Sequence, residues 1–229
     1  MPRHRDPRRY PVHGIDVSHH QGLITWSRLP RQGVRFAYLK ASEGGDLRDP
    51  MFRAAARQAR AAGLAVGAYH YFTLCRPGAV QAANFLDALE GSAVDLPPAI
   101  DLEHEGNCRG GVAPQPFERE LGVFIAMVER RTGRAPILYT TRDFHRGYLA
   151  GSGLRDRPIW MRDLLGGLDS VRGAHIVFFQ SASNGRLDGL SCRVDLDAFI
   201  GSERDFQAQR APRARSFKME SPARPDFAE

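Results

Sequence analysis

Short apolar segments that end in polar residues, most of them followed by a helical segment, recur along the first two thirds of the chain. Strands are expected at residues 12–22, 34–45, 64–72, 98–104 and 135–141. Helices are expected at residues 49–63, 77–89 and 117–131, with a shorter one at 141–149. Parallel strands joined by helices are buried on both faces, and the continuous apolar run 64–72 has this character. The alternation predicts an α/β fold around a parallel sheet.

The final third departs from this rhythm. Strands are expected at residues 157–163, 174–182 and 191–199, with no long helix between the last two. Asn184 and Gly185 form a dipeptide that is typical of a hairpin turn. Five strand–helix units followed by three strands, a (β/α)5(β)3 pattern, predict a TIM-like barrel in a single domain. A chain of 229 residues with 42% hydrophobic residues can build one core of that size.

Both ends of the chain are expected to lie outside the barrel. Residues 1–11 are expected to form a basic arm, residues 12–202 the barrel, and residues 203–229 a disordered tail. The net charge of +6 comes largely from these ends, and a terminal basic run without interleaved aromatic residues is typical of a solvated tail. We therefore expect no nucleic-acid partner. No apolar run is long enough to span a membrane, no signal peptide is visible, and the oligomeric state stays open.

Segment 98–104 ends in two carboxylates, Asp101 and Glu103. Successive strand side chains point to opposite faces, so the two acids share one face, and Ile100 and Leu102 share the other. Neighbouring buried carboxylates repel each other, and desolvation raises the pKa of the less well hydrogen-bonded one. One acid can then hold a proton while the other stays charged. The alternative is that exposed acids simply mark the point where the strand emerges into solvent.

The positions of other polar residues favour the functional alternative. Polar side chains stand at or near the carboxyl ends of the expected strands: Asp16, Lys40, Glu43, His70, Asp101, Glu103, Tyr139, Asp163, Gln180 and Asp195. The active sites of α/β barrels lie at that end of the strands, so these side chains are expected to meet. For Lys40 and Glu43, a structural ion pair in the barrel mouth is expected ahead of a functional role.

Cysteine and histidine spacing predicts no metal site and no cofactor. None of the three cysteines stands in a zinc-binding spacing. Cys75 and Cys108 each follow an expected strand, so a disulfide between neighbouring loops and two reduced thiols are both open. His19, His20 and His70 are expected to make local hydrogen bonds rather than to bind a metal.

An ordered series of motifs gives the chain a family resemblance. The motifs are GIDVSHHQG at 14–22, LKASEG at 39–44, GAYHYF at 67–72, IDLE at 100–103, ILYT at 137–140, IW at 159–160, FQ at 179–180 and VDLDAF at 194–199. With these motifs the chain resembles the family 25 glycoside hydrolases, the Chalaropsis-type lysozymes. The resemblance implies a flattened barrel with a groove across its top. It also implies hydrolysis of the β-1,4 bond between N-acetylmuramic acid and N-acetylglucosamine in peptidoglycan. The expected partner is therefore the peptidoglycan glycan strand, in an extracellular, periplasmic or wall-associated location.

The resemblance also implies roles for the acids. Glu103 matches the family's proton donor, and Asp101 would orient or stabilise the reacting sugar. Asp16 and Asp195 match two further acidic positions of the groove. Three other side chains, Tyr69, Tyr139 and Gln180, are candidates to hydrogen-bond the sugar. The Trp160 ring is a candidate either to stack on the sugar or to be buried.

The chain departs from the family pattern at three places. Asp197 replaces the usual asparagine of the last strand, which removes an amide donor. Phe179 stands where a tryptophan is more usual, and Met161 and Arg162 follow Trp160 where smaller residues are common. These departures bear on which sugars the groove prefers.

Three mechanisms remain open for the acids. A carboxylate nucleophile for retention would lie about 5 to 5.5 Å from the acid, and a base for inversion about 6.5 to 9.5 Å away. In the third route the substrate's own acetamido oxygen attacks while Asp101 holds the amide, and this route is favoured.

Two rival functions are hydrolysis of another N-acetylated glycan, such as chitin, and wall binding without turnover. The presence of all four acids argues against the last.

Overall fold

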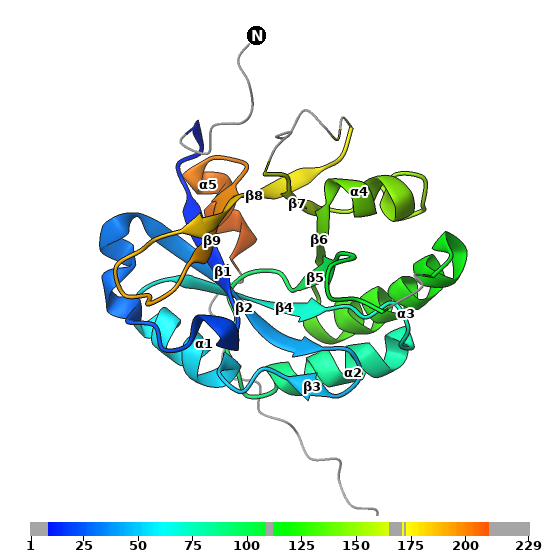
Figure 1. The fold of residues 1–229 in the computed structure, drawn as a ribbon, viewed down its shortest axis with the longest axis horizontal. Coiled ribbons are helices and arrows are strands. Elements are labelled where there is room, and N and C mark those ends of the chain that lie inside the picture. The colour runs from blue at the N-terminus through cyan, green and yellow to red at the C-terminus, as the bar shows by residue number, and fades with distance from the viewer. Residues whose placement is uncertain (1–8, 109–111, 165–170, 172, 211–229) are drawn as a thin grey trace, which may run out of the picture.

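The computed structural model describes residues 9–108, 112–164, 171 and 173–210, and its strands form a closed barrel (Figure 1). The eight barrel strands are β1 (His13–Val17), β2 (Val34–Glu43), β4 (Ala65–Tyr71), β5 (Ala99–Leu102), β6 (Ile137–Thr141), β7 (Ile159–Arg162), β8 (Ile176–Gly185) and β9 (Val194–Phe199). A two-residue strand, β3 (Leu47–Arg48), pairs with the end of β2. The predicted α/β barrel is confirmed.

Strand β9 closes the barrel in the opposite direction from the other strands. Strands β1 to β8 of the barrel pair in parallel, whereas β9 is antiparallel to both β8 and β1. Asp16 therefore pairs in register with Asp195, which lies near the beginning of β9. Because β9 is reversed, its amino end lies at the same rim as the carboxyl ends of the parallel strands.

Helices cover the outside of the parallel part of the barrel (Figure 1). They are α1 (Phe52–Ala61), α2 (Gly78–Leu89), α3 (Pro114–Thr132) and α4 (Arg142–Phe144), which continues into a π-helical turn at His145–Leu149. A further helix, α5 (Glu203–Gln209), packs against one end of the barrel instead. Three 3-10 turns follow β1, at His19–Gln21, Trp26–Arg28 and Pro30–Gln32. Helix α1 begins three residues later than expected, and Asp49 precedes it, accepting a hydrogen bond from the Met51 N–H at 2.8 Å. Within the described ranges, no helix has both the length and the apolarity needed to cross a bilayer.

Alternating strand residues build two separate apolar layers. Ile100 and Leu102 point outward into the layer between strands and helices, as the alternation predicts. The barrel interior holds large rings such as Tyr38 and Phe178, both fully buried. Gly67 gives one of these rings its space, because a Cβ there would lie 2.2 Å from the Tyr38 ring. Side chains thus fill the interior of the barrel, so any site must lie at one of its rims.

The disordered tail was predicted to begin at residue 203, but the residues that follow are helical. Residues 203–209 form α5, whose first turn is capped by Ser202 and Asp205 through reciprocal hydrogen bonds. Phe206 is 2% exposed and packs its ring against Phe36 and Phe199 inside the barrel end. One buried residue in a short polar helix produces no sequence periodicity, which is why the helix was not predicted. Residues 1–8 and 211–229 lie outside the described ranges, so the domain limits stay predictions.

Two loop predictions have different outcomes. Asn184 and Gly185 do not form a tight turn, because Gly185 is still paired with Val194 and residues 186–193 make the connection. Cys75 and Cys108 form the disulfide, with Cα atoms 6.0 Å apart. This bridge joins the loop after β5 to the loop after β4.

Candidate active site

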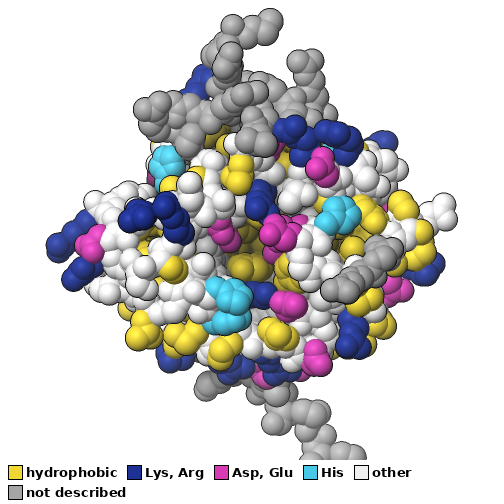
Figure 2. Space-filling model, in the orientation of Figure 1, with side chains coloured by type: hydrophobic (Ala, Val, Ile, Leu, Met, Phe, Trp, Pro, Cys, Tyr) yellow, Lys and Arg dark blue, Asp and Glu magenta, His cyan; other side chains and the backbone are white. Residues whose placement is uncertain are grey.

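An open cleft of about 260 Å³ lies at the barrel rim where the parallel strands end. It is lined by Asp16, Tyr69, Asp101, Glu103, Tyr139, Trp160, Arg162, Gln180, Ser183 and Asp195. Figure 2 shows a hollow near the centre of this face, with hydrophobic side chains at its floor and charged ones at its border. The structure therefore brings together all eight site residues expected from the sequence. Arg162 and Ser183 were not among them.

Asp101 and Glu103 face the cleft from the end of β5. Asp101 is 9% exposed, and its Oδ1 atom is buried without a hydrogen-bond partner among the described residues. Burial, reinforced by the charge of Glu103, raises the pKa of Asp101 well above its usual range. Burial also raises the pKa of Glu103, although Arg162 opposes this. The pair can therefore hold a proton at a higher pH than an isolated, solvent-exposed carboxyl group would.

Asp16 is oriented by a chain of two hydrogen bonds. The Gln180 Nε2 atom donates to Asp16 Oδ2 at 2.7 Å, and the Tyr139 hydroxyl donates to Gln180 Oε1 at 3.1 Å. Because its carbonyl oxygen accepts from Tyr139, the Gln180 amide group must point its NH₂ at Asp16. Burial and the neighbouring Asp195 raise the pKa of Asp16 to about 7.

Asp197 and Trp160 form the support below Asp16. Trp160 is 1% exposed, and its Nε1 atom donates to Asp197 Oδ1 at 2.9 Å. So little exposed ring favours the buried role of Trp160 over stacking on a sugar. Asp197 is also 1% exposed, and its Oδ2 atom is buried and accepts no hydrogen bond from the described residues. Burial and the charge of Asp16 raise the pKa of Asp197 well above its usual range, which favours the protonated form, the form that can donate to Asp16.

Arg162 contacts the expected proton donor. Its Nη1 atom lies 3.0 Å from Glu103 Oε2 and 3.5 Å from Glu105 Oε2. From the sequence, Arg162 was only a departure from the family pattern. Its contact with Glu103 depends on β6 separating β5 from β7, an arrangement that spacing along the chain does not reveal.

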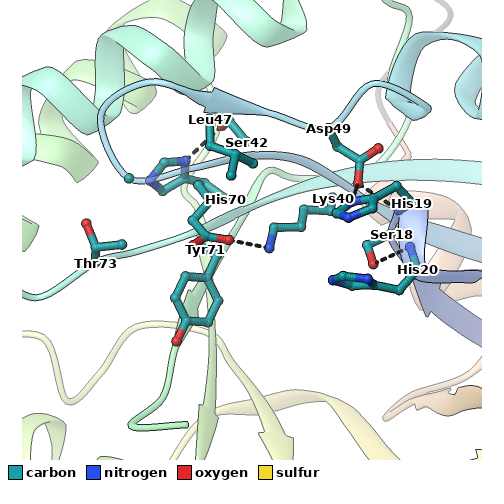
Figure 3. A network of polar contacts seen from close by, with 12 residues as sticks. Ser18, His19, His20, Lys40, Ser42, Leu47, Asp49, His70, Tyr71 and Thr73 are labelled. Atoms are coloured by element: carbon teal, nitrogen blue, oxygen red, sulfur yellow. Dashed lines mark hydrogen bonds and ion pairs between the residues drawn. The ribbon is translucent and has the colours of Figure 1, made fainter. Parts of the chain in front are cut away.

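Four of the expected strand-end residues lie outside the cleft lining. Lys40 forms an ion pair with Glu43 at 2.6 Å, and its side chain extends toward the Tyr71 ring, 5.1 Å from the ring centroid (Figure 3). This is the structural pairing considered from the sequence. Asp163 accepts a hydrogen bond from Arg142 Nε at 2.9 Å.

His70, the fourth, lies behind the cleft. One ring nitrogen hydrogen-bonds the Ser42 hydroxyl at 2.8 Å (Figure 3). The other lies 3.2 Å from Gln81 Oε1. Burial lowers the pKa of His70 to about 3, so its ring is neutral. His19 pairs with Asp49 at 3.0 Å. Both histidines thus make the local contacts expected of them.

Comparison with known proteins assigns the family. The sequence model of the Glycosyl hydrolases family 25 matches residues 15–190, a range that holds most of the cleft. The chain belongs to glycosyl hydrolase family 25. It is therefore a glycoside hydrolase, and the resemblance in the motifs is confirmed.

Relatives of this family 25 enzyme include both bacterial lysozymes and a protein without an assigned activity. The chain is 34% identical to Lysozyme M1 of Streptomyces globisporus, over 83% of this chain and 68% of the relative. It is 34% identical to the uncharacterized protein YegX of Escherichia coli K12, over 89% and 75% respectively. The structure of a family 25 glycosyl hydrolase from Bacillus anthracis superposes with a TM-score of 0.80 and 32% identity, covering 91% of this chain and 97% of that one.

We expect Asp197→Asn to stabilise this family 25 enzyme as the pH rises. Because the folded protein raises the pKa of Asp197, it retains a proton there that the unfolded chain has already released. The free energy of unfolding therefore falls with rising pH, by up to about 1.4 kcal/mol per pH unit for this group. An asparagine keeps a donor for Asp16 and an acceptor for Trp160, and it does not titrate.

Urea denaturation of wild type and Asp197→Asn checks this from about pH 4 to about pH 8, the range above the ordinary aspartate pKa. The two stabilities should agree at the acid end and separate as the pH rises, with the variant the more stable. Asp197→Leu is the control: it has no donor for Asp16 and should be less stable throughout. Parallel curves for wild type and Asp197→Asn would show that Asp197 is already ionised in the folded protein.

Proposed function

We propose that this enzyme is a lysozyme that hydrolyses the β-1,4 bond between N-acetylmuramic acid and N-acetylglucosamine in peptidoglycan, with Glu103 as its general acid. The observation that carries the proposal is the single cleft in which Asp16, Asp101, Glu103 and Asp195 meet. Relatives named Lysozyme M1, and N,O-diacetylmuramidase in a Chalaropsis species, support the choice of substrate.

The two acids of β5 have environments suited to different roles. Glu103 has a side chain that is 15% exposed, so it reaches the open part of the cleft where a glycosidic oxygen would lie. Burial raises its pKa, which favours the protonated form that an acid needs. Asp101 lies deeper but still lines the cleft with 9% of its surface exposed, so its carboxylate can accept the acetamido N–H of the sugar. Gln180 and Tyr139 hold Asp16 in place across the cleft.

The substrate implies the place of action. Peptidoglycan lies outside the cytoplasmic membrane, so we infer that the enzyme works in the periplasm, at the wall or outside the cell. The cleft is open at the surface (Figure 2), which allows a polymer to enter from the side.

The new reducing end identifies the bond that is cut. We expect digestion of purified peptidoglycan, followed by borohydride reduction and mass spectrometry, to yield fragments ending in muramitol. Fragments ending in glucosaminitol would mean that the other β-1,4 bond is cut and would contradict the proposal. Cleavage of chitin oligomers without cleavage of peptidoglycan would instead support the rival function, hydrolysis of another N-acetylated glycan.

A further inference from the structure

Among the described residues that line the cleft, Arg162 is the only positively charged one. The other charged lining residues are the four acids. Its contacts are with Glu103 and with Glu105, whose side chain is 81% exposed. The Arg162 side chain is itself 25% exposed. An arginine at the open edge of a site, held by one exposed and one largely buried carboxylate, stays within reach of a third carboxylate that enters the cleft.

This ion pair opposes the chemistry proposed for Glu103. A general acid must hold a proton, yet a guanidinium at 3.0 Å stabilises the carboxylate form. The titratable and charged groups that face Glu103 are Asp101 on its own strand, Asp16 and Asp195 from β1 and β9, Tyr71 and Tyr139 from β4 and β6, Glu105 from the following loop, and Arg162 from β7. Of these groups, Arg162 alone favours ionised Glu103. Its removal from Glu103 would therefore favour the acid form.

The substrate supplies a group that can remove it. Muramic acid carries a lactyl carboxylate, which is free where the stem peptide is absent, and the stem peptide carries carboxylates of its own. Four acids in one cleft repel such a glycan, so a cation is needed to accept it. A guanidinium fits a carboxylate with two parallel hydrogen bonds, whereas neutral N-acetylglucosamine polymers offer it no such partner.

We propose that Arg162 binds a carboxylate of the substrate and, in turning to it, leaves Glu103 free to take up the proton that Glu103 then donates to the glycosidic oxygen. This proposal rests on the proposed function and makes Arg162 a specificity-determining residue. Asp101 can supply the proton, because burial raises its pKa and the charge of the neighbouring Glu103 raises it further. Asp101 would then be ionised when it accepts the acetamido N–H, and no proton is gained or lost overall.

Arg162→Gln tests the proposal on three soluble glycans: uncrosslinked peptidoglycan with its peptides, the same glycan stripped of peptides by an amidase, and chitin oligomers. We expect the variant to raise KM about tenfold or more for glycans whose carboxylate Arg162 binds, and to leave KM for chitin oligomers unchanged. An effect on the stripped glycan identifies the lactyl carboxylate. An effect confined to the glycan with peptides identifies a peptide carboxylate.

The pH profile separates this role from a structural one. The basic limb of kcat/KM reports the free enzyme, and it should move up by about one pH unit in Arg162→Gln, because Glu103 has lost its counter-charge. The basic limb of kcat on peptidoglycan should stay where it is, because Arg162 has already left Glu103 in the complex.

Arg28→Gln is the control, since Arg28 pairs with Asp188 at the surface and lies outside the cleft lining. It should match the wild type on all three glycans. Equal losses on all three glycans for Arg162→Gln, with both pH limbs unmoved, would overturn the proposal. A thermal unfolding midpoint below that of the wild type, together with equal losses, would assign a structural role to Arg162 instead. The proposed function is judged separately, by whether the wild type cuts peptidoglycan at all.

Discussion

Glu103→Gln is expected to lower kcat on peptidoglycan by about 10²- to 10⁴-fold while leaving KM close to that of the wild type. Glutamine has nearly the size of glutamate and still hydrogen-bonds the glycosidic oxygen, but it cannot transfer a proton to the leaving sugar. The loss should therefore appear in kcat, which reports the chemical step when release of product is fast. Clearing of a peptidoglycan suspension, together with counting of new reducing ends, measures it.

The control for this variant is Glu90→Gln, which changes an exposed glutamate after α2 in the same way and should clear the suspension at the wild-type rate. If Glu103→Gln cleared as fast as the wild type, Glu103 would not be the acid. If neither the wild type nor Glu103→Gln cleared the suspension but both bound it, the chain would be a wall-binding module, the non-enzymatic rival.

The barrel was predictable because its physical causes are local. The parallel strands are short, largely apolar segments that end in polar residues, and the outward direction of Ile100 and Leu102 follows from strand alternation alone. Helix α3 was visible from its apolar stripe, which includes Phe117 and Leu121, and from Gly133 at its end. The hairpin signal indicated the antiparallel pairing of β9 with β8, although the turn lies elsewhere than at Asn184 and Gly185. The closure of β9 onto β1 was not predictable, and neither was α5, which depends on one side chain, Phe206, that fills the barrel end.

The residues that line the cleft were largely predictable, but their contacts were not. A residue near a strand's polar end is placed at the rim by the fold, and this was enough to bring Asp16, Asp101 and Gln180 together. Whether such a residue faces the cleft or a neighbour depends on register, which placed Lys40 against Glu43 instead. The contact of Arg162 with Glu103 spans three strands and has no signature in either segment.

The second large effect is expected at Asp101, where the sequence left three mechanisms open. Asp101 lines the cleft and is 9% exposed, so its carboxylate can accept an acetamido N–H from a sugar bound there. If the acetamido oxygen attacks the anomeric carbon, the ring that forms is cationic, and a carboxylate at its N–H stabilises it. Asp101→Asn removes that charge and should lower kcat by about 10²-fold or more. Substrates without the acetamido carbonyl should be poor for the wild type, because they lack the nucleophile.

A 2-fluoro glycoside with a good leaving group separates this route from attack by Asp101. The fluorine slows breakdown of a glycosyl-enzyme, so a protein nucleophile would be labelled and the intact mass of the protein would rise. We expect no labelling, because such a substrate has no acetamido oxygen and Asp101 does not itself bond to the sugar. A glycosyl adduct on Asp101 would establish the double displacement instead. Proton NMR of the first product anomer excludes the remaining route: both of these mechanisms retain the β configuration, whereas a water molecule activated across the cleft would invert it.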